Sequence, residues 1–121
     1  MPLPSDRRVW RLEADDGSVV ATDVEYADGM WRRFLGLMGR RELPSGHGLF
    51  IKPCSSIHMF FMRFPLDVAF VDNDGRVVRA YHGIRPWRIS RVVRGAKGAI
   101  ELPAGALAAA GVASGSVLRM V

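Results

Sequence analysis

The fold class is indicated most directly by residues 66–81, LDVAFVDNDGRVVRAY. The first six residues are rich in the β-branched and aromatic side chains that favour strands, and Asp72-Asn73-Asp74-Gly75 is a turn sequence. After the turn, polar and apolar side chains alternate from Arg76 to Tyr81, as in a strand with one buried face. The stretch therefore predicts a β-hairpin within a β-rich core.

Similar patterns on either side of this hairpin predict further strands. Residues 9–12 and 19–24 flank the turn sequence Asp15-Asp16-Gly17-Ser18, so they are expected to form a second hairpin. Shorter strand candidates lie at residues 48–51, 57–61, 88–93, 99–102 and 117–121.

Two segments have helical rather than strand patterns. Over residues 28–39, apolar side chains recur at spacings of three and four, and Arg32 and Arg33 are expected to face away from that stripe. The alanine-rich segment 103–110 predicts a short helix that ends at Gly111. The expected apolar stripe of the first helix consists of Met30, Trp31, Phe34, Leu35, Leu37 and Met38.

Together these patterns predict a mainly β fold, either a β-sandwich or a barrel-like arrangement. It would contain seven or eight short, mostly antiparallel strands and two short α-helices. The chain has 121 residues, of which 49% are hydrophobic and 24% charged, and this is typical of one ordinary domain. Residues 1–121 are therefore expected to form a single domain, with residues 1–6 as a loose tail.

The sequence also carries signals about its compartment. The first eight residues contain no apolar segment of the kind found in signal peptides. No stretch approaches the roughly 18 consecutive apolar residues of a membrane-spanning helix. A single cysteine cannot form an internal disulfide, so the fold does not depend on oxidation. These features predict a cytoplasmic protein without a membrane span.

The net charge is +5, and nearly all of the basic side chains are arginines, which suit bidentate contacts with phosphate and carboxylate groups. In a strand, a spacing of three places successive charges on alternate faces, which favours a solvated surface. Binding of a phosphate-bearing ligand or nucleic acid is the alternative, although the chain has no P-loop, RNA-binding-sheet or zinc motif. The basic side chains with this spacing are Arg85, Arg88, Arg91, Arg94 and Lys97, with Trp87 among them.

Polar groups inside apolar runs are the main candidate site residues, because such groups must find partners or face a cleft. His58 lies in the run 54–64, Asp67 in the strand candidate 66–71, and Glu101 in a later one. The structural interpretation is a hydrogen-bonded core histidine and carboxylates paired with arginines. The functional interpretation is that the three groups converge in an apolar cleft.

Cys54, His58 and Met62 have side chains that can bind metals, spaced by four residues. In an extended segment each pair would be about 13 Å apart, too far for one ion. No metal or cofactor is therefore predicted. A thiol nucleophile with His58 as its base is an alternative, but no oxyanion hole or helix N-terminus that would lower the pKa of the thiol is recognisable.

Four motifs, in order along the chain, resemble the domain of unknown function 192 family. In place of the family's commonest Trp before the central Met and Asn-Thr pair after it, this chain has His58, Phe61 and Met62, a sub-pattern with Cys and Ile-His. The resemblance implies a compact β-sandwich or barrel-like fold with small helices, and it implies no activity. The matching residues are Gly36 to Arg40, Gly48 to Phe50, the set Met59, Pro65, Leu66, Asp67, Phe70 and Gly75, and Ile100 to Gly105.

These observations predict a small binding module that takes a small or anionic ligand or a peptide in a cleft. One alternative is a hydrolase in which His58 works with Asp67 or Cys54. Another is an accessory protein that binds nucleic acid or a protein partner through its arginine-rich surface. No catalytic residue or oligomeric state can be assigned. The residues predicted to contact the ligand are His58, Asp67, Glu101, Arg85 and Arg88.

Overall fold

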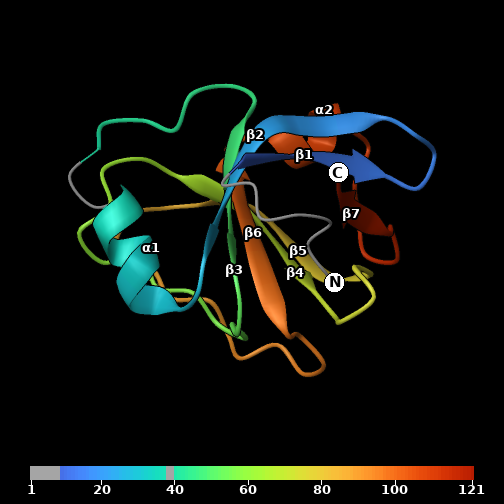
Figure 1. The fold of residues 1–121 in the computed structure, drawn as a ribbon. Helices are drawn as coiled ribbons and strands as arrows, with labels where there is room; N and C mark the ends of the chain where they lie inside the picture. The colour runs from blue at the N-terminus through green and yellow to red at the C-terminus, as the bar shows by residue number, and fades with distance from the viewer. Residues whose placement is uncertain (1–8, 38–39) are drawn as a thin grey trace.

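The computed structural model of the protein describes residues 9–37 and 40–121 (Figure 1). The strands are β1 Val9–Ala14, β2 Val19–Ala27, β3 His47–Ile51, β4 Leu66–Val71, β5 Val77–Ile84, β6 Gly98–Pro103 and β7 Leu118–Met120. The helices are α1 Met30–Leu37 and α2 Ala106–Ala109. The prediction of a mainly β fold with two short helices is thus confirmed. The predicted tail at residues 1–6 and the predicted end of the first helix near Gly39 lie outside the described residues.

The seven strands form one sheet in the order β5-β4-β6-β3-β2-β1-β7. Only β2 and β3 are parallel neighbours, and α1 lies in the connection between them, as a parallel pair requires. All the other neighbouring strands are antiparallel. The sheet curves until its edges meet at one bridge between Arg76 and Val117, which makes it barrel-like without closing it.

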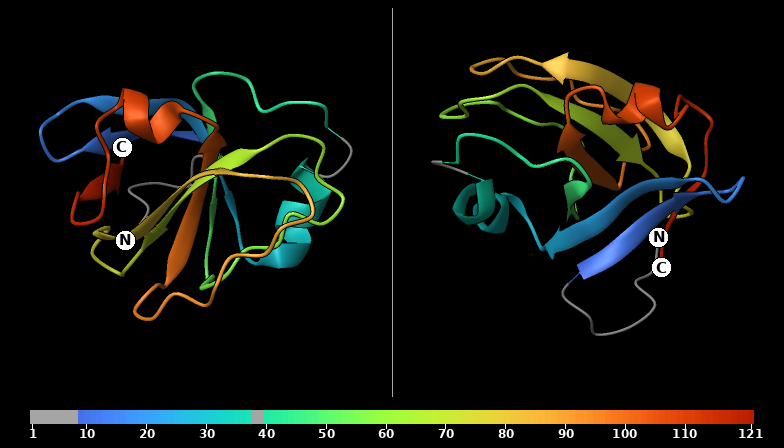
Figure 2. Two further views of the ribbon diagram at one scale, coloured as in Figure 1. Left: turned by 180° about the vertical axis from the view of Figure 1, so that it is seen from behind. Right: turned by 90° about the horizontal axis from the view of Figure 1, so that it is seen from above.

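The middle of the sheet is buried on both faces. All six residues of β4 are buried, as expected for a central strand covered on both sides. Figure 2 shows α1 and α2 at opposite ends of the sheet. The core cluster on the α2 side includes Leu12, Phe50, Ala69, Ile100, Leu102 and Leu107. The cluster on the α1 side includes Leu37, Ile51, Met59, Leu66, Val68 and Phe70.

Two long connections, residues 52–65 between β3 and β4 and residues 85–97 between β5 and β6, lie side by side and are called here the paired loops. Backbone hydrogen bonds join them: Met59 N–H donates to Arg88 O at 2.7 Å, and Ser90 N–H donates to Ile57 O at 2.8 Å. The strands predicted at 57–61 and 88–93 are therefore wrong as regular strands. Only one isolated bridge, His58 with Ile89, remains of that pairing.

The physical reason for this difference is the backbone itself. Phe61, the last residue of the first predicted strand, and Trp87, the residue before the second, adopt positive φ angles of 64° and 68°, which interrupt extended structure at both positions. The second predicted helix is also shorter than expected, because Gly105 adopts a φ of 95° and α2 begins only after it. None of the helices within residues 9–37 and 40–121 combines the length and apolarity needed to cross a bilayer.

Candidate functional site

The sheet separates the predicted site residues into two groups. Asp67 lies opposite Leu102 in the register of β4 and β6, whereas Glu101 lies opposite Val68. Because side chains alternate along a strand, the two carboxylates project from opposite faces of the sheet. The neighbours of His58 pack in the cluster on the Glu101 side. A single cleft lined by His58, Asp67 and Glu101 is therefore not formed.

Asp67 is fully buried and accepts three backbone hydrogen bonds. Its Oδ1 accepts from Gly83 N–H at 2.8 Å, and its Oδ2 accepts from Gly105 N–H at 3.1 Å and Leu107 N–H at 3.0 Å. The expected arginine partner is absent from these contacts, and three N–H groups satisfy the carboxylate instead. Asp67 thereby fastens β5 and the start of α2 to β4, which is a structural task.

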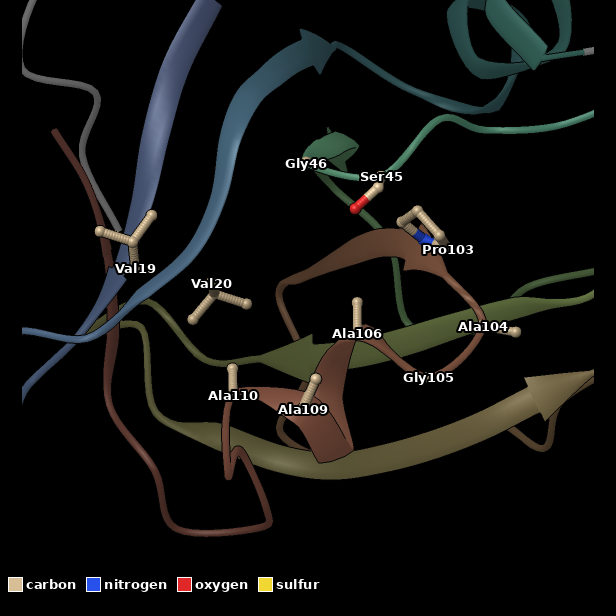
Figure 3. Close-up of a pocket in the computed structure, with 10 residues that line it drawn as sticks. All are labelled: Val19, Val20, Ser45, Gly46, Pro103, Ala104, Gly105, Ala106, Ala109 and Ala110. Atoms are coloured by element: carbon tan, nitrogen blue, oxygen red, sulfur yellow. The ribbon is translucent and has the colours of Figure 1, made fainter.

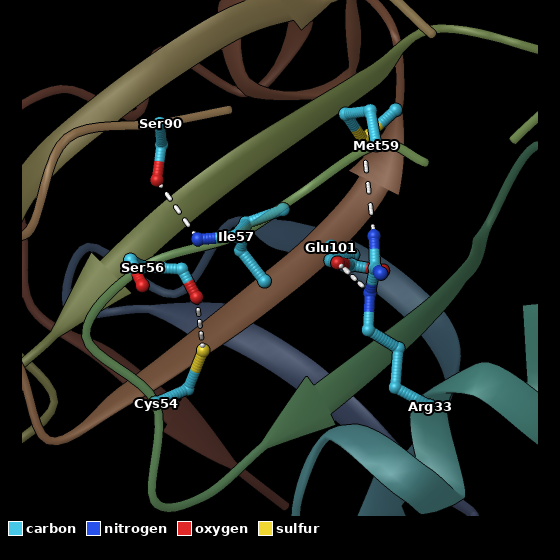
Figure 4. A network of polar contacts seen from close by, with 7 residues as sticks. All are labelled: Arg33, Cys54, Ser56, Ile57, Met59, Ser90 and Glu101. Atoms are coloured by element: carbon cyan, nitrogen blue, oxygen red, sulfur yellow. Dashed lines mark hydrogen bonds and ion pairs between the residues drawn. The ribbon is translucent and has the colours of Figure 1, made fainter. Parts of the chain in front are cut away.

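Glu101 forms a buried ion pair with Arg33, which reaches it from α1 (Figure 4). Arg33 Nε donates to Glu101 Oε1, and Arg33 Nη2 lies 3.8 Å from the sulfur of Met59. Glu101 Oε2 has no hydrogen-bond partner among the described residues. Burial raises the pKa of Glu101 to about 7, and the charge and hydrogen bond of Arg33 offset only part of that effect.

The prediction that Arg33 faces away from the core is wrong. Its side chain is 2% exposed, whereas Trp31, expected in the apolar stripe, is 71% exposed. The helix is turned so that the guanidinium contacts Glu101 on the sheet, since an unpaired buried charge is costly. Glu101 within a buried strand signals that a cation must be near, but the sequence offers many arginines and does not indicate which one.

Cys54 is buried and unreactive in character. Its Sγ–H donates to Ser56 O at 3.1 Å (Figure 4), and burial raises the pKa of the thiol to about 11. The thiolate is the nucleophilic form, so little of it exists at neutral pH. Burial, followed by the charge of Arg33, lowers the pKa of His58, whose Nδ1 has no partner. The hydrogen bond described for the Cys54 thiol thus goes to a backbone carbonyl rather than to a base that could activate it.

Two cavities are found on the described part of the molecule. One, of about 440 Å³, opens between β2, the start of β3 and α2, and is lined by small or apolar residues such as Val20, Gly46 and Ala106 (Figure 3). The other, of about 490 Å³, lies beside Cys54 and Lys97. Neither is lined by any of the five predicted contact residues. No group of three His, Cys, Asp or Glu side chains suited to a metal occurs in the described part of the chain.

The paired loops, by contrast, bring three predicted residues together. His58 forms the bridge with Ile89, next to Arg88, and Arg85 begins the same loop. Around them lie exposed apolar residues that the sequence analysis did not single out. We call these the apolar loop residues: Phe60, Phe61, Trp87, Ile89 and Val92.

The rings of the apolar loop residues contact one another across the two loops. The centroids of Phe61 and Trp87 are 5.0 Å apart, and those of Phe60 and Trp87 are 6.0 Å apart. The His58 ring lies 5.1 Å from that of Phe60. Even so, Trp87 remains 59% exposed and Phe61 56% exposed. Large apolar groups held together in water mark candidate interaction sites.

Two strained turns hold these rings outward. Arg88 N–H donates to Arg85 O at 3.3 Å, and Met62 N–H donates to Met59 O at 3.3 Å, so each turn has four residues. Trp87 and Phe61 each stand third in their turn with positive φ, where glycine or asparagine is usual. Such a conformation costs roughly 1–3 kcal/mol for a bulky residue and tends to occur at functional sites.

The paired loops also concentrate the positive charge of the molecule. Residues 52–65 and 85–97 contain seven basic side chains and no acidic one, while the rest of the chain has ten basic and twelve acidic side chains. No loop cation takes part in an ion pair among the described residues. The seven are Lys52, Arg63, Arg85, Arg88, Arg91, Arg94 and Lys97.

Comparison with known proteins adds a family and a fold. The sequence model of the domain of unknown function 192, described as "Uncharacterized ACR, COG1430", matches residues 11–120. A UPF0127 protein of Pyrococcus furiosus is 34% identical over 113 residues, which are 89% of this chain and 95% of that protein. A UPF0127 protein of Pyrococcus abyssi is 41% identical over 88 residues, 68% of this chain and 72% of its own length.

Two crystal structures resemble this one. A protein from Sinorhizobium meliloti 1021, provisionally described as a transcription regulator, has a TM-score of 0.73 and 26% identity, covering 96% of this chain and 98% of its own. A protein of unknown function from Novosphingobium aromaticivorans has a TM-score of 0.76 and 23% identity, covering 92% and 83% respectively. The second likeness shows a shared fold alone.

Proposed function

Since this chain belongs to the domain of unknown function 192 family, which is described as uncharacterised, we propose its function from its own surface: it is a binding module that recognises an anionic partner through the paired loops. The observation that carries this proposal is the charge of those loops, which have seven basic side chains, no acidic one and no ion pair with any other described residue. Unneutralised cations on one surface attract anionic partners and orient their approach.

Preorganisation of the loops supports the proposal. Trp87 N–H donates to Met59 O at 2.7 Å and Val93 N–H donates to Ser55 O at 2.8 Å, so hydrogen bonds fix one loop against the other. A surface already held in one conformation loses less entropy when it binds. The hydrogen-bonded loops hold Phe61 and Trp87 at strained φ angles, and a need for exposed rings best explains this strain.

Catalysis by His58 with Asp67 or Cys54 has less support. The three hydrogen bonds that Asp67 accepts from described residues all come from backbone N–H groups, and Asp67 lies on the other face of the sheet from Glu101. The pKa of the Cys54 thiol is raised to about 11, so it is a poor nucleophile. Of the residues predicted to contact a ligand, His58, Arg85 and Arg88 remain in the proposed surface.

The proposal is tested by retention on an immobilised polyanion. Arg85→Gln/Arg88→Gln should elute from heparin at lower salt than the wild type, because each removed contact weakens a salt-dependent interaction. The matched control is Arg40→Gln/Arg41→Gln, two exposed arginines outside the paired loops. Both pairs remove the same net charge. If both elute alike, retention reflects overall charge alone and the proposed surface is wrong.

The identity of the anionic partner is a separate question. The Sinorhizobium meliloti protein described as a transcription regulator makes nucleic acid one candidate. Short DNA and RNA therefore belong among the partners tested.

A further inference from the structure

We propose that the anionic partner is a lipid surface: the apolar loop residues enter the headgroup region of an anionic membrane, and the arginines beside them contact lipid phosphates. This inference rests on the proposed function, since it names the partner of the same surface. It is carried by the kinds of side chain that the loops expose, by the packing of the exposed rings against one another and by the distribution of charge.

The aliphatic side chains among the apolar loop residues favour a membrane over nucleic acid as the partner. Ile89 is 64% exposed and Val92 is 72% exposed, more than either Phe61 or Trp87. Neither side chain has a ring on which a base could stack, and stacking is the main apolar contact made with single strands. In a membrane interface, aliphatic and aromatic side chains both gain from leaving water, and tryptophan favours the headgroup level.

The arrangement of the rings agrees with a broad, flat partner. Phe61 meets Trp87 edge to face, with an interplanar angle of 61°, so the rings pack against each other rather than forming an open slot for a base. Neither of the two cavities described above is lined by any apolar loop residue. The rings project from two turns, which suits insertion into a surface better than capture of a segment in a groove.

Charge selects the type of surface. Seven basic side chains accompany the apolar loop residues, so a second copy of the same surface would be repelled. Arginine can lay its apolar stem along the membrane interface while its guanidinium reaches phosphates. The rest of the chain carries a net charge of −2, so an anionic bilayer attracts the paired loops and repels the remainder.

The first test uses vesicles of equal parts phosphatidylglycerol and phosphatidylcholine, with pure phosphatidylcholine vesicles for comparison. The wild-type chain should sediment with the anionic vesicles only. Its tryptophan emission should shift to the blue as Trp87 leaves water, and Trp87→Phe should bind while losing most of that shift. Binding to both kinds of vesicle alike would overturn the role of charge.

The second test removes the aliphatic groups. Ile89→Ser/Val92→Ser should weaken vesicle binding about tenfold or more, since both side chains would no longer be buried in the interface. The matched control is Val9→Ser/Val19→Ser, exposed valines on β1 and β2, which should bind like the wild type. Equal binding by all three proteins would overturn the inference.

Polyuridylate and a duplex DNA fragment are measured at the same ionic strength. If either binds while the anionic vesicles do not, the lipid inference fails, but the proposed anion-binding surface stands. If the arginine variant and its control behave alike on heparin, the proposed function fails, and the lipid inference fails with it. The two failures are therefore distinguishable.

Discussion

At the scale of single residues, Glu101 shows how one buried group can make the folding stability depend on pH. Its carboxyl group titrates near 4.5 when unperturbed, and burial raises its pKa to about 7 in the folded protein. Between these values the folded chain binds the proton more tightly than the unfolded chain. This stabilisation is complete below about pH 4.5 and is lost as the pH rises through 7.

We expect the unfolding free energy of Glu101→Gln to lack this pH dependence. The wild type should lose about 3 kcal/mol of unfolding free energy between pH 4.5 and pH 8 relative to the variant, because each unit of pKa shift corresponds to about 1.4 kcal/mol. Urea denaturation at a series of pH values measures it. Glu42→Gln, at an exposed position, is the control and should follow the wild type. Parallel curves for Glu101→Gln and the wild type would contradict the prediction.

Trp87 illustrates a residue kept at a cost to stability. Asparagine accepts a positive φ more readily than tryptophan, so Trp87→Asn should relieve strain of about 1 kcal/mol, and the lost ring contacts offset part of this. We expect thermal stability to stay equal or rise, while binding to the anionic vesicles falls. Trp87→Phe keeps both the strain and the apolar ring and is the comparison. A clear drop in melting temperature for Trp87→Asn would make the indole structural.

At the scale of elements, Asp67 connects three of them. Its carboxylate on β4 accepts N–H groups from β5, from the turn before α2 and from α2 itself. In Asp67→Asn one oxygen becomes an NH₂ group that must face backbone donors. We expect unfolding free energy to fall by about 2–4 kcal/mol, because buried N–H groups lose a charged acceptor.

Urea denaturation checks this loss, and amide exchange should quicken at Gly83, Gly105 and Leu107. Asp74→Asn, at an exposed position in the turn before β5, is the control and should change stability little. An asparagine variant as stable as the wild type would show that the three hydrogen bonds contribute little.

The elements also show where sequence patterns suffice. The hairpin of β4 and β5 follows from alternation and a turn sequence, both local signals, and it is found as predicted. The paired loops also contain apolar segments that resemble strands, but the two turns with positive φ at Phe61 and Trp87 interrupt regular pairing there. No local pattern indicates that an aromatic residue will occupy a position that glycine usually takes.

Only the part of the candidate site that depends on local sequence patterns could be predicted. The sequence predicts His58 as a polar group within an apolar run and Arg85 and Arg88 as basic residues with a spacing of three, and all three lie on the paired loops. The separation of Asp67 from Glu101 depends on the register of β4 against β6, which is a tertiary property. The partner of Glu101 depends on the rotation of α1, and the apolar pattern of that helix suggested the wrong rotation for Arg33.

At the scale of the whole molecule, the protein combines a doubly covered sheet with two strongly basic loops. The burial of β4 and β6 stabilises the sheet, and the paired loops carry the apolar loop residues and seven basic side chains that form no ion pair with other described residues. The buried sheet and the proposed binding surface on the paired loops are thus built from different segments. Substitutions at exposed loop positions should accordingly alter binding without unfolding the sheet.

The position of β7 has a consequence for the order of events during synthesis. Leu12 of β1 pairs with Met120 of β7, and Gly75 O accepts from Leu118 N–H. On the ribosome, β1 and β2 emerge first and leave the outer edge of β1 open until residues 118–120 arrive. An open strand edge is a template for pairing with other chains. The nascent chain is therefore exposed to aggregation through this edge until β7 has paired with β1.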